Sequence, residues 1–321
     1  MLEDQIRRLA RTKAKPVKRV RMSNLADLSN PFEVIAPDGP LTPLVLSSPH
    51  SGSHYPIDLI EASSLSKTAL RRSEDCYVDE LFSSAKFAGV PMIRALYPRA
   101  YLDLNREPYE LDPEMFTDPL PDFINSASPR VAAGLGTVAR IVANQKEIYA
   151  RKLTWTEVEA RINRLYKPYH QTLRRLVNAA RDQFGYCVLI DCHSMPSAGL
   201  PTGKGIAGDS VDVVLGDRNG LSCSSLITEE TERILSSLGY SIIRNNPYAG
   251  GFTTQSYGEP ETGVHALQIE INRALYVDEM SLSRRPSFAK LKDDLRVFLE
   301  TLSEFSGDAR KALTFQRLSA E

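Results

Sequence analysis

The chain has 321 residues, of which 42% are hydrophobic, enough for one large domain or two ordinary ones with a sizeable core. Its 39 Lys and Arg residues nearly balance its 40 Asp and Glu residues, so the formal charge of -1 does not indicate nucleic acid as the main partner. No run approaches the roughly 18 apolar residues that a membrane span requires, so no membrane partner is expected.

Cysteine usage and the N-terminus bear on the compartment. The four cysteines, Cys76, Cys187, Cys192 and Cys223, include no CxxC pair. This pattern is typical of reduced cytosolic thiols rather than a disulfide framework. Because the N-terminus also lacks an apolar signal core, we expect a cytoplasmic protein.

The first 22 residues are strongly basic. A basic arm can contact nucleic acid or acidic lipid, but such a segment is more often a solvated or loosely docked tail. We therefore expect residues 1–28 to form a basic N-terminal arm and residues 29–321 to form a single domain.

Strands and helices are predicted to alternate from about Phe32 onward. Short apolar runs bounded by Pro, Gly or polar residues indicate buried strands, and longer segments with apolar residues three or four positions apart indicate helices. Such alternation implies an α/β fold with a largely parallel or mixed sheet. The strands are expected at 44–48, 91–95, 186–191, 211–215, 241–244 and 265–271, and the helices at 67–88, 128–184, 222–238 and 287–305.

Two further segments are expected to be irregular or extended. Residues 101–104 continue as an extended segment, and residues 107–129 are rich in Pro and Asp. A long loop in a compact domain is usually functional, so residues 107–129 are a candidate wall of a binding pocket.

Two histidines follow predicted strands. His50 comes after the strand that stops at Pro49, and His193 comes after the strand that ends near Asp191. In open α/β sheets, ligands bind just past the carboxyl ends of the strands. A lone histidine is usually structural, but two in matching positions favour a metal site, since neutral imidazole is a common zinc ligand. Asp191 or a backbone carbonyl is a candidate to orient one ring.

A catalytic zinc with three protein ligands needs a third one, often a carboxylate. The segment Ser73-Glu74-Asp75-Cys76-Tyr77-Val78-Asp79 offers several. Asp75 and Asp79 lie one helical turn apart and would share a face of the predicted helix, but spacing does not separate Glu74 from Asp75. The alternative is that these acids favour the dipole at a helix N-terminus.

Glu270 ends the apolar run 266–269. A carboxylate there is costly unless it is solvated, paired or functional. Beside a metal it would be a general base, and the alternative is a buried partner for an arginine such as Arg273.

Residues 97–106 contain a cluster of groups that bind carboxylates. The guanidinium of Arg106 matches a carboxylate bidentately, and Asn105 adds an amide donor. These two residues therefore suggest recognition of an amino-acid carboxylate. The alternative for this segment is a structural pair between Arg99 and Asp103.

Two other enzyme classes find little support. The Gly-rich segment 246–254 contains no GKS or GKT, so it is interpreted as a loop that covers the substrate rather than a nucleotide cradle. No GxSxG occurs, which disfavours a serine hydrolase.

The sequence resembles the N-formylglutamate amidohydrolase family in an ordered set of segments that covers about residues 40–280. Each piece alone is weak, but their order and spacing are specific. The matching pieces are Pro49-His50-Ser51-Gly52 and residues 75–81, 99–106, 191–195 and 263–270.

This family is grouped with zinc-dependent carboxypeptidase-like and aspartoacylase-like hydrolases. The resemblance therefore implies a three-layer α/β/α fold of the phosphorylase/hydrolase-like type, with a central mixed, largely parallel sheet. It also implies one divalent metal, Zn²⁺, held by His50, Asp75 and His193, with Glu270 as the base that activates water.

The resemblance further implies how substrate is held. Asn105 and Arg106 would clamp the substrate carboxylate, and Arg99 would polarise the scissile carbonyl. Members that release glutamate have an extra basic residue in the loop that corresponds to 245–254, whereas here Arg244 lies just upstream of it.

The expected function is zinc-dependent hydrolysis of the amide bond of an N-formyl or N-acyl amino acid such as N-formylglutamate. The products would be formate, or another carboxylate, and the free amino acid. The alternatives are a peptidase or peptidoglycan amidase on the same scaffold, and a non-catalytic ligand-binding protein. The expected partner is a small-molecule substrate, and the sequence does not specify an oligomeric state.

Overall fold

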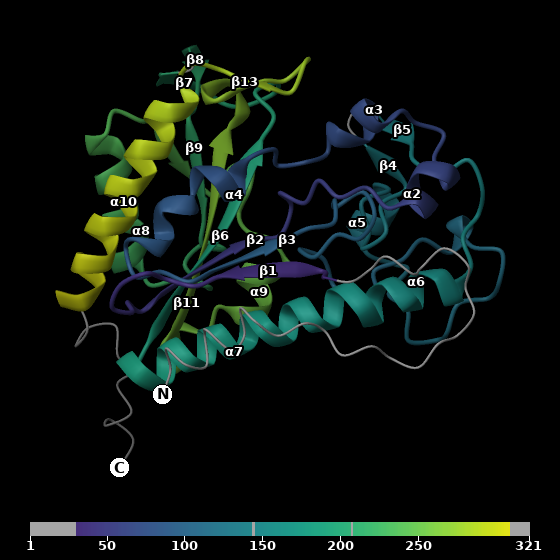
Figure 1. The fold of residues 1–321 in the computed structure, drawn as a ribbon, viewed down its shortest axis with the longest axis horizontal. Coiled ribbons are helices and arrows are strands. Elements are labelled where there is room, and N and C mark those ends of the chain that lie inside the picture. Colours follow the sequence, from purple (N-terminus) through teal and green to yellow (C-terminus); the bar gives the residue numbers. More distant parts are fainter. Residues whose placement is uncertain (1–29, 143–144, 207, 309–321) are drawn as a thin grey trace.

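A seven-stranded sheet runs through the computed structural model, which describes residues 30–142, 145–206 and 208–308 (Figure 1). The predicted basic arm, residues 1–28, lies outside the described residues. The strand order is β1-β3-β2-β6-β11-β9-β10. The strands are β1 Phe32–Ile35, β2 Leu44–Ser48, β3 Met92–Ala95, β6 Cys187–Met195, β9 Val213–Gly216, β10 Ile242–Arg244 and β11 Val264–Asn272.

The four central strands, β3, β2, β6 and β11, are parallel, so their carboxyl ends lie at one edge of the sheet. Antiparallel pairing occurs further out, between β1 and β3 and between β9 and β11. The prediction of a mixed, largely parallel sheet is confirmed. Buried parallel strands read as continuous apolar runs, and for this reason β2, β6 and β11 were visible in the sequence.

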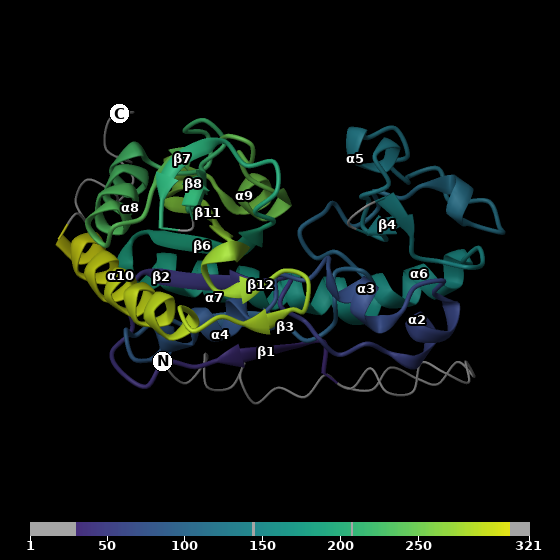
Figure 2. The same ribbon diagram turned by 90° about the horizontal axis from the view of Figure 1, so that it is seen from above.

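Helices cover both faces of this sheet. Side chains alternate along a strand, so Val45 of β2 packs with α7 (Lys167–Phe184) on one face, whereas Leu44 and Leu46 pack on the other. The second face is covered by α4 (Val78–Leu81), α8 (Ser225–Ser237) and α10 (Phe288–Asp308). Figures 1 and 2 show the three layers, and the predicted α/β/α arrangement is confirmed.

A second lobe lies beside the sheet and is formed largely by irregular chain. We call residues 107–153 the cap. In both views it lies to one side of the strands, next to α2 (Ile57–Ala62) and α3 (Lys67–Arg71) (Figures 1 and 2). The cap contains the 3₁₀ turn Pro113–Met115, α5 Pro129–Ala132, β4 Ile141–Val142 and β5 Lys146–Glu147.

The predicted helix over 67–88 is wrong as a single element. It consists of α3, α4 and the 3₁₀ helix Ser83–Lys86, with a break at residues 72–77. Tyr77 has a φ of 63°, in the left-handed region, which is incompatible with a continuing α-helix. Asp75 lies in this break, so Asp75 and Asp79 do not share a helix face.

The predicted helix over 128–184 is continuous only in its second part, and in its first part the only α-helix among the described residues is the four-residue α5. Trp155 starts a continuous helix of α6 (Trp155–Arg161), a π-helical turn (Ile162–Tyr166) and α7. A capping box between Thr154 and Glu157 sets its start, and Gly185, with a φ of 87°, ends it. Residues 128–153 belong to the cap instead. No helix of the described residues is long and apolar enough to cross a membrane.

Candidate active site

His50 stands at the carboxyl end of β2 and is almost fully buried. Its Nε2 lies 2.7 Å from Oδ1 of Asp103. Its Nδ1 faces Oδ2 of Asp75 at 3.4 Å and has no hydrogen-bond partner. The ring therefore has one nitrogen anchored to a carboxylate and the other directed at the space beside Asp75.

His193 lies inside β6 rather than after it, because that strand extends to Met195. Its Nδ1 lies 2.9 Å from Oδ2 of Asp75, and its Nε2 lies 2.9 Å from Oδ2 of Asp191. Asp191 and His193 share a face of the strand because they are two residues apart. The ring centroids of His50 and His193 are 4.7 Å apart, so the two predicted histidines meet.

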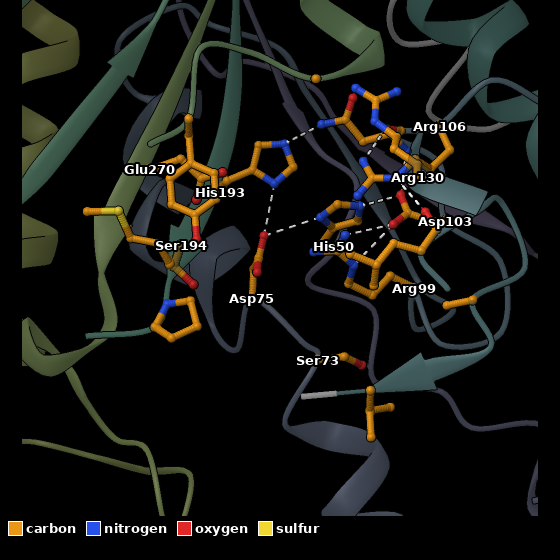
Figure 3. Close-up of a pocket in the computed structure, with 18 of the residues that line it drawn as sticks. His50, Ser73, Asp75, Arg99, Asp103, Arg106, Arg130, His193, Ser194 and Glu270 are labelled. Carbon is orange, nitrogen blue, oxygen red and sulfur yellow. Dashed lines mark hydrogen bonds and ion pairs between the residues drawn. The ribbon is translucent and has the colours of Figure 1, made fainter. Parts of the chain in front are cut away.

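Asp75 lies in the break after α3 and is the acidic residue that faces the histidines. Figure 3 shows it between the two rings. Burial would raise the pKa of Asp75, but its hydrogen bond to His193 and the nearby ring of His50 hold that pKa well below 3.8. Its other oxygen accepts a hydrogen bond from Arg273 at 2.9 Å. Glu74 turns away and accepts hydrogen bonds from Arg71 and Tyr55.

The donor set around these residues fits a metal ion. His50, Asp75 and His193 offer ligand atoms that all lie within 4.8 Å of one another. Burial would lower the pKa of His193, but the charge of Asp191 and hydrogen bonds to Asp191 and Asp75 raise it well above 6.5, so this position favours positive charge. Carboxylates and guanidiniums both surround this position. The carboxylates are Asp75, Asp103, Asp191 and Glu270, and the guanidiniums include Arg99, Arg106 and Arg273.

Each histidine is oriented by a buried carboxylate on its far side. Asp103 beside His50 is held by Arg99, whose Nη2 donates at 2.7 Å, and by the backbone N–H of Asn105 at 2.9 Å. Asp191 beside His193 accepts a hydrogen bond from Ser47 at 3.0 Å. Histidines that bind a metal through one ring nitrogen typically hydrogen-bond a carboxylate through the other, as these two pairs would.

The sequence pattern suggested this orienting role for Asp191 but not for Asp103. For Asp103 the sequence predicts only a structural pair with Arg99, and the structure contains that pair. The signal that could have been used is its position two residues before Asn105, inside the segment that carries the resemblance.

Glu270 projects into the cavity from β11, in register with His193 on β6. Burial raises its pKa from 4.5 to about 7, against the lowering effect of His193. Gln268 donates a hydrogen bond to its Oε1 at 2.9 Å. Arg273, the alternative partner considered for Glu270, instead donates to Asp75 and Ser194. A buried carboxyl with a raised pKa in a cavity is a candidate general base.

Asn105 and Arg106 differ in what their side chains contact, although they are neighbours in the sequence. The amide of Asn105 donates to Asp191 at 3.0 Å and accepts from the backbone of Thr253 at 2.7 Å, so it is engaged inside the protein. Arg106 lines the cavity, and it donates to the carbonyls of Leu135 and Asn105. The segment 101–104 that leads to them is turned rather than extended.

These groups surround a cavity of about 400 Å³ between the carboxyl edge of the sheet and the cap (Figure 3). The cap contributes residues 130–148 to its wall, and the loop 107–129 contributes no lining residue. The Gly-rich segment also lines it, and a Cβ at Gly251 would lie 2.4 Å from Nδ2 of Asn105. Arg244 lies outside the cavity and donates to Glu232 at 2.6 Å. The cap residues that line the cavity are Arg130, Leu135, Ala139, Ile141, Val142 and Ile148.

The sequence matches known proteins over most of its length. A family model described as N-formylglutamate amidohydrolase matches residues 42–277. An N-formylglutamate deformylase from Pseudomonas putida is 28% identical over 240 residues, which are 74% of this chain and 82% of that protein. A second N-formylglutamate deformylase, from Pseudomonas aeruginosa, is 28% identical over 242 residues, 74% of this chain and 84% of that protein.

Solved structures agree with these matches. The crystal structure of N-formylglutamate amidohydrolase from Ralstonia eutropha JMP134 has a TM-score of 0.80 and 35% identity, and the match covers 86% of this chain and 98% of that one. A gene product from Agrobacterium tumefaciens has a TM-score of 0.60 at 17% identity, covering 87% of this chain and 96% of that one. The second likeness concerns the fold alone.

Proposed function

The chain belongs to the N-formylglutamate amidohydrolase family, and on that premise we propose that it hydrolyses the amide bond of an N-formyl amino acid such as N-formylglutamate. The products are formate and the free amino acid. The observation that carries the proposal is the meeting of His50, Asp75 and His193 beside Glu270 in one cavity.

A single divalent metal, Zn²⁺, is part of this proposal, with His50, Asp75 and His193 as its ligands. Two imidazoles and a carboxylate are a ligand set that catalytic zinc uses in other hydrolases. When bound, such a metal supplies Lewis acidity, which polarises a carbonyl and makes water more acidic. Asp103 and Asp191 keep the two rings in the orientation that binding requires.

Glu270 acts as the general base. It takes a proton from the attacking water and passes it to the leaving amine, which requires a carboxyl that both accepts and releases protons near neutral pH. Its pKa of about 7 in the buried site suits this exchange. Gln268 holds one carboxylate oxygen and leaves the other for the proton.

Two arginines bind the substrate. Arg99 uses Nε and Nη2 to hold Asp103, which leaves Nη1 for the oxygen of the scissile carbonyl. One such donor to a developing oxyanion is worth about 3–4 kcal/mol. Arg106 binds the α-carboxylate, and Asn105 positions it by fixing the neighbouring backbone between Asp191 and Thr253.

The size of the cavity supports a small substrate over a peptide or peptidoglycan. About 400 Å³ is near the lower end of ligand pockets, which span roughly 300–1,000 Å³. The cap forms a wall over it and restricts long substrates.

The test is a hydrolysis screen over N-formyl and N-acetyl amino acids, with zinc added and removed. N-formyl compounds should be cleaved only with metal present, and binding of the panel without any cleavage would favour a ligand-binding protein. Metal analysis of the double variant His50→Ala/His193→Ala should show loss of zinc. His54→Ala, which changes an exposed histidine outside the cavity, is the matched control. Full zinc occupancy in the double variant would refute the ligand assignment.

A further inference from the structure

Two side chains of one long helix bond to the chain on both sides of Asn105. The Nε2 atom of His170 lies 2.8 Å from the carbonyl oxygen of Leu104, and the hydroxyl of Tyr166 donates to the carbonyl of Arg106 at 2.7 Å. The two rings lie against each other, with centroids 4.3 Å apart. The backbone around Asn105 is therefore tied to this helix at two points.

The helix is irregular where it makes these contacts. Tyr166 is the last residue of the π-helical turn Ile162–Tyr166, and His170 lies in the first turn of α7. Side chains four residues apart lie on the same side of a helix. A π-helical turn is uncommon and frequently occurs at a functional site. Together these features suggest that the contact with residues 104–106 serves more than packing.

The second ring nitrogen of His170 joins α7 to α9 (Phe252–Tyr257) (Figure 1). Nδ1 lies 2.9 Å from the hydroxyl of Tyr257, and the ring of Phe252 meets the imidazole edge to face at 5.6 Å. The carbonyl of Leu104 can only accept a hydrogen bond, so Nε2 carries the proton and Nδ1 accepts from Tyr257. Burial lowers the pKa of His170 from 6.5 to about 4, so the ring is neutral near pH 7, as this assignment requires.

Helix α9 also holds the side chain of Asn105. The backbone N–H of Thr253 donates to Oδ1 of Asn105 at 2.7 Å. On its other side, Nδ2 of Asn105 donates to Asp191 at 3.0 Å and lies 2.9 Å from Nε2 of His193. Asn105 is thus bonded to α7 through the neighbouring backbone and to α9 through its side chain, and His170 connects the two helices.

We propose that His170 and Tyr166 are positioning residues of the active site, which set the direction of the side chains on residues 105–106. Rotation of the backbone there would move Asn105 away from Asp191 and turn Arg106 out of the cavity. Neither His170 nor Tyr166 lines the cavity, so they act through these neighbours and not on the substrate. This inference rests on the proposed function, in which Arg106 binds the substrate carboxylate.

The experiment exchanges the imidazole of His170 for amides of two lengths. The side-chain nitrogen of Gln reaches about as far as Nε2 and can donate to Leu104, whereas that of Asn is too short. In His170→Asn, kcat/KM for N-formylglutamate should fall about 10- to 100-fold, since a displacement of about 1 Å can cost this much. His170→Gln should stay within about fivefold of the unmodified enzyme. An equal fall in both variants would overturn the proposal, because packing of the ring would then explain it.

Tyr166→Phe is a second, milder test, because it removes only the hydroxyl that holds the carbonyl of Arg106. KM should rise about three- to tenfold while kcat changes by less than about twofold, since Arg106 binds substrate and takes no part in the proton transfer. In His170→Asn both constants should change, because Asn105 also contacts Asp191. Unchanged KM in Tyr166→Phe, or unchanged kcat/KM in His170→Asn, would refute the positioning role. If His170→Asn does not fold, the result for Tyr166→Phe decides alone.

Leu176→Ala is the matched control. Leu176 is buried further along the same helix. Its substitution leaves a cavity and lowers stability, but KM and kcat of the folded enzyme should stay within about twofold, because residues 104–106 keep their hydrogen bonds. A loss of kcat/KM in Leu176→Ala as large as in His170→Asn would mean that the helix acts only through stability, and the proposal would fail.

Hydrogen exchange separates the positioning role from the proposed function. The N–H of Asp103 donates to the carbonyl of Thr137, and the N–H of Asn105 donates to Oδ1 of Asp103. Exchange in this segment should be about tenfold faster in His170→Asn than in the unmodified protein or in His170→Gln. If the unmodified protein cleaves no N-formyl compound, the proposed function fails, and exchange alone tests the positioning. Equal exchange in all three proteins would then refute it.

Discussion

The two walls of the cavity are built in different ways. On the sheet side, His193 and Glu270 stand on β6 and β11, which are hydrogen-bonded to each other along nine residue pairs. On the cap side, Arg130 stands on the short helix α5 and Leu135 on the irregular chain that follows it. The side chain of Arg130 is 35% exposed, and Leu135 is 40% exposed. Groups on buried, paired strands are held rigidly, whereas groups on loops vary and move more easily.

This difference suggests a division of roles. We expect the sheet side to carry the metal and the proton transfer, which require accurate placement, and the cap side to carry the selection of substrate. Substitutions on the sheet side should therefore change kcat or metal binding, and substitutions on the cap side should change KM.

The largest effect is expected for Glu270→Gln. The amide cannot take a proton from water, so kcat should fall about 10²- to 10⁴-fold, while the metal content and the fold are retained. Steady-state kinetics and metal analysis measure both quantities. Glu261→Gln, at an exposed glutamate, is the matched control. Rates like those of the unmodified enzyme would remove Glu270 from the mechanism.

Burial of Glu270 should also appear in the pH dependence of stability. In metal-free protein its pKa is about 7 when folded against 4.5 as the ordinary value, so the folded state binds more protons between these two pH values. The free energy of unfolding should therefore fall by up to about 3 kcal/mol as the pH rises from 4.5 to 7. The amide side chain in Glu270→Gln does not titrate, so this variant should lack this part of the decrease in the free energy of unfolding with pH.

Denaturant unfolding of both proteins in the presence of a chelator measures this difference. If the free energy of unfolding depends on pH in the same way in the two proteins, Glu270 is solvated in the folded state. The sheet side of the cavity would then be more open to water than its burial indicates.

A smaller effect is expected from the carboxylates behind the histidines. Asp191→Asn and Asp103→Asn should each weaken metal binding about 10- to 100-fold, because a neutral amide orients and polarises the ring less well. Competition with a chelator measures the affinity, and circular dichroism checks the fold. Asp112→Asn, on the cap and outside the cavity, is a suitable control. Unchanged affinity in both variants would show that the rings do not depend on these partners.

The smallest effect is expected on the apolar part of the cap. Leu135→Ala removes a partly exposed side chain, so the free energy of unfolding should change by less than about 1 kcal/mol and KM by about threefold. The value of kcat should not change. A hundredfold loss of kcat would mean that the cap takes part in the chemistry and would end the distinction between the two walls.

Much of the sheet was predictable because a strand that is buried on both faces is a continuous apolar run in the sequence. The apolar runs of β2, β6 and β11 identify these strands, and His50, His193 and Glu270 were expected near their carboxyl ends for that reason. The helix breaks were not predicted, because residues 72–77 and 128–153 keep some helical spacing although Tyr77 and Thr154 interrupt it.

The sequence alone determined the buried strands β2, β6 and β11, the sheet edge at which the histidines stand and the family resemblance. Only the tertiary structure decided that Asp75 rather than Glu74 faces the histidines, that Asp103 supports His50, and that residues 130–148 rather than 107–129 wall the cavity. The physical reason is distance along the chain. Periodicity reports which face of an element is buried, whereas Asp75 and His193 are 118 residues apart and His50 and Asp103 are 53 apart, so their contacts exist only after the strands and the cap have packed.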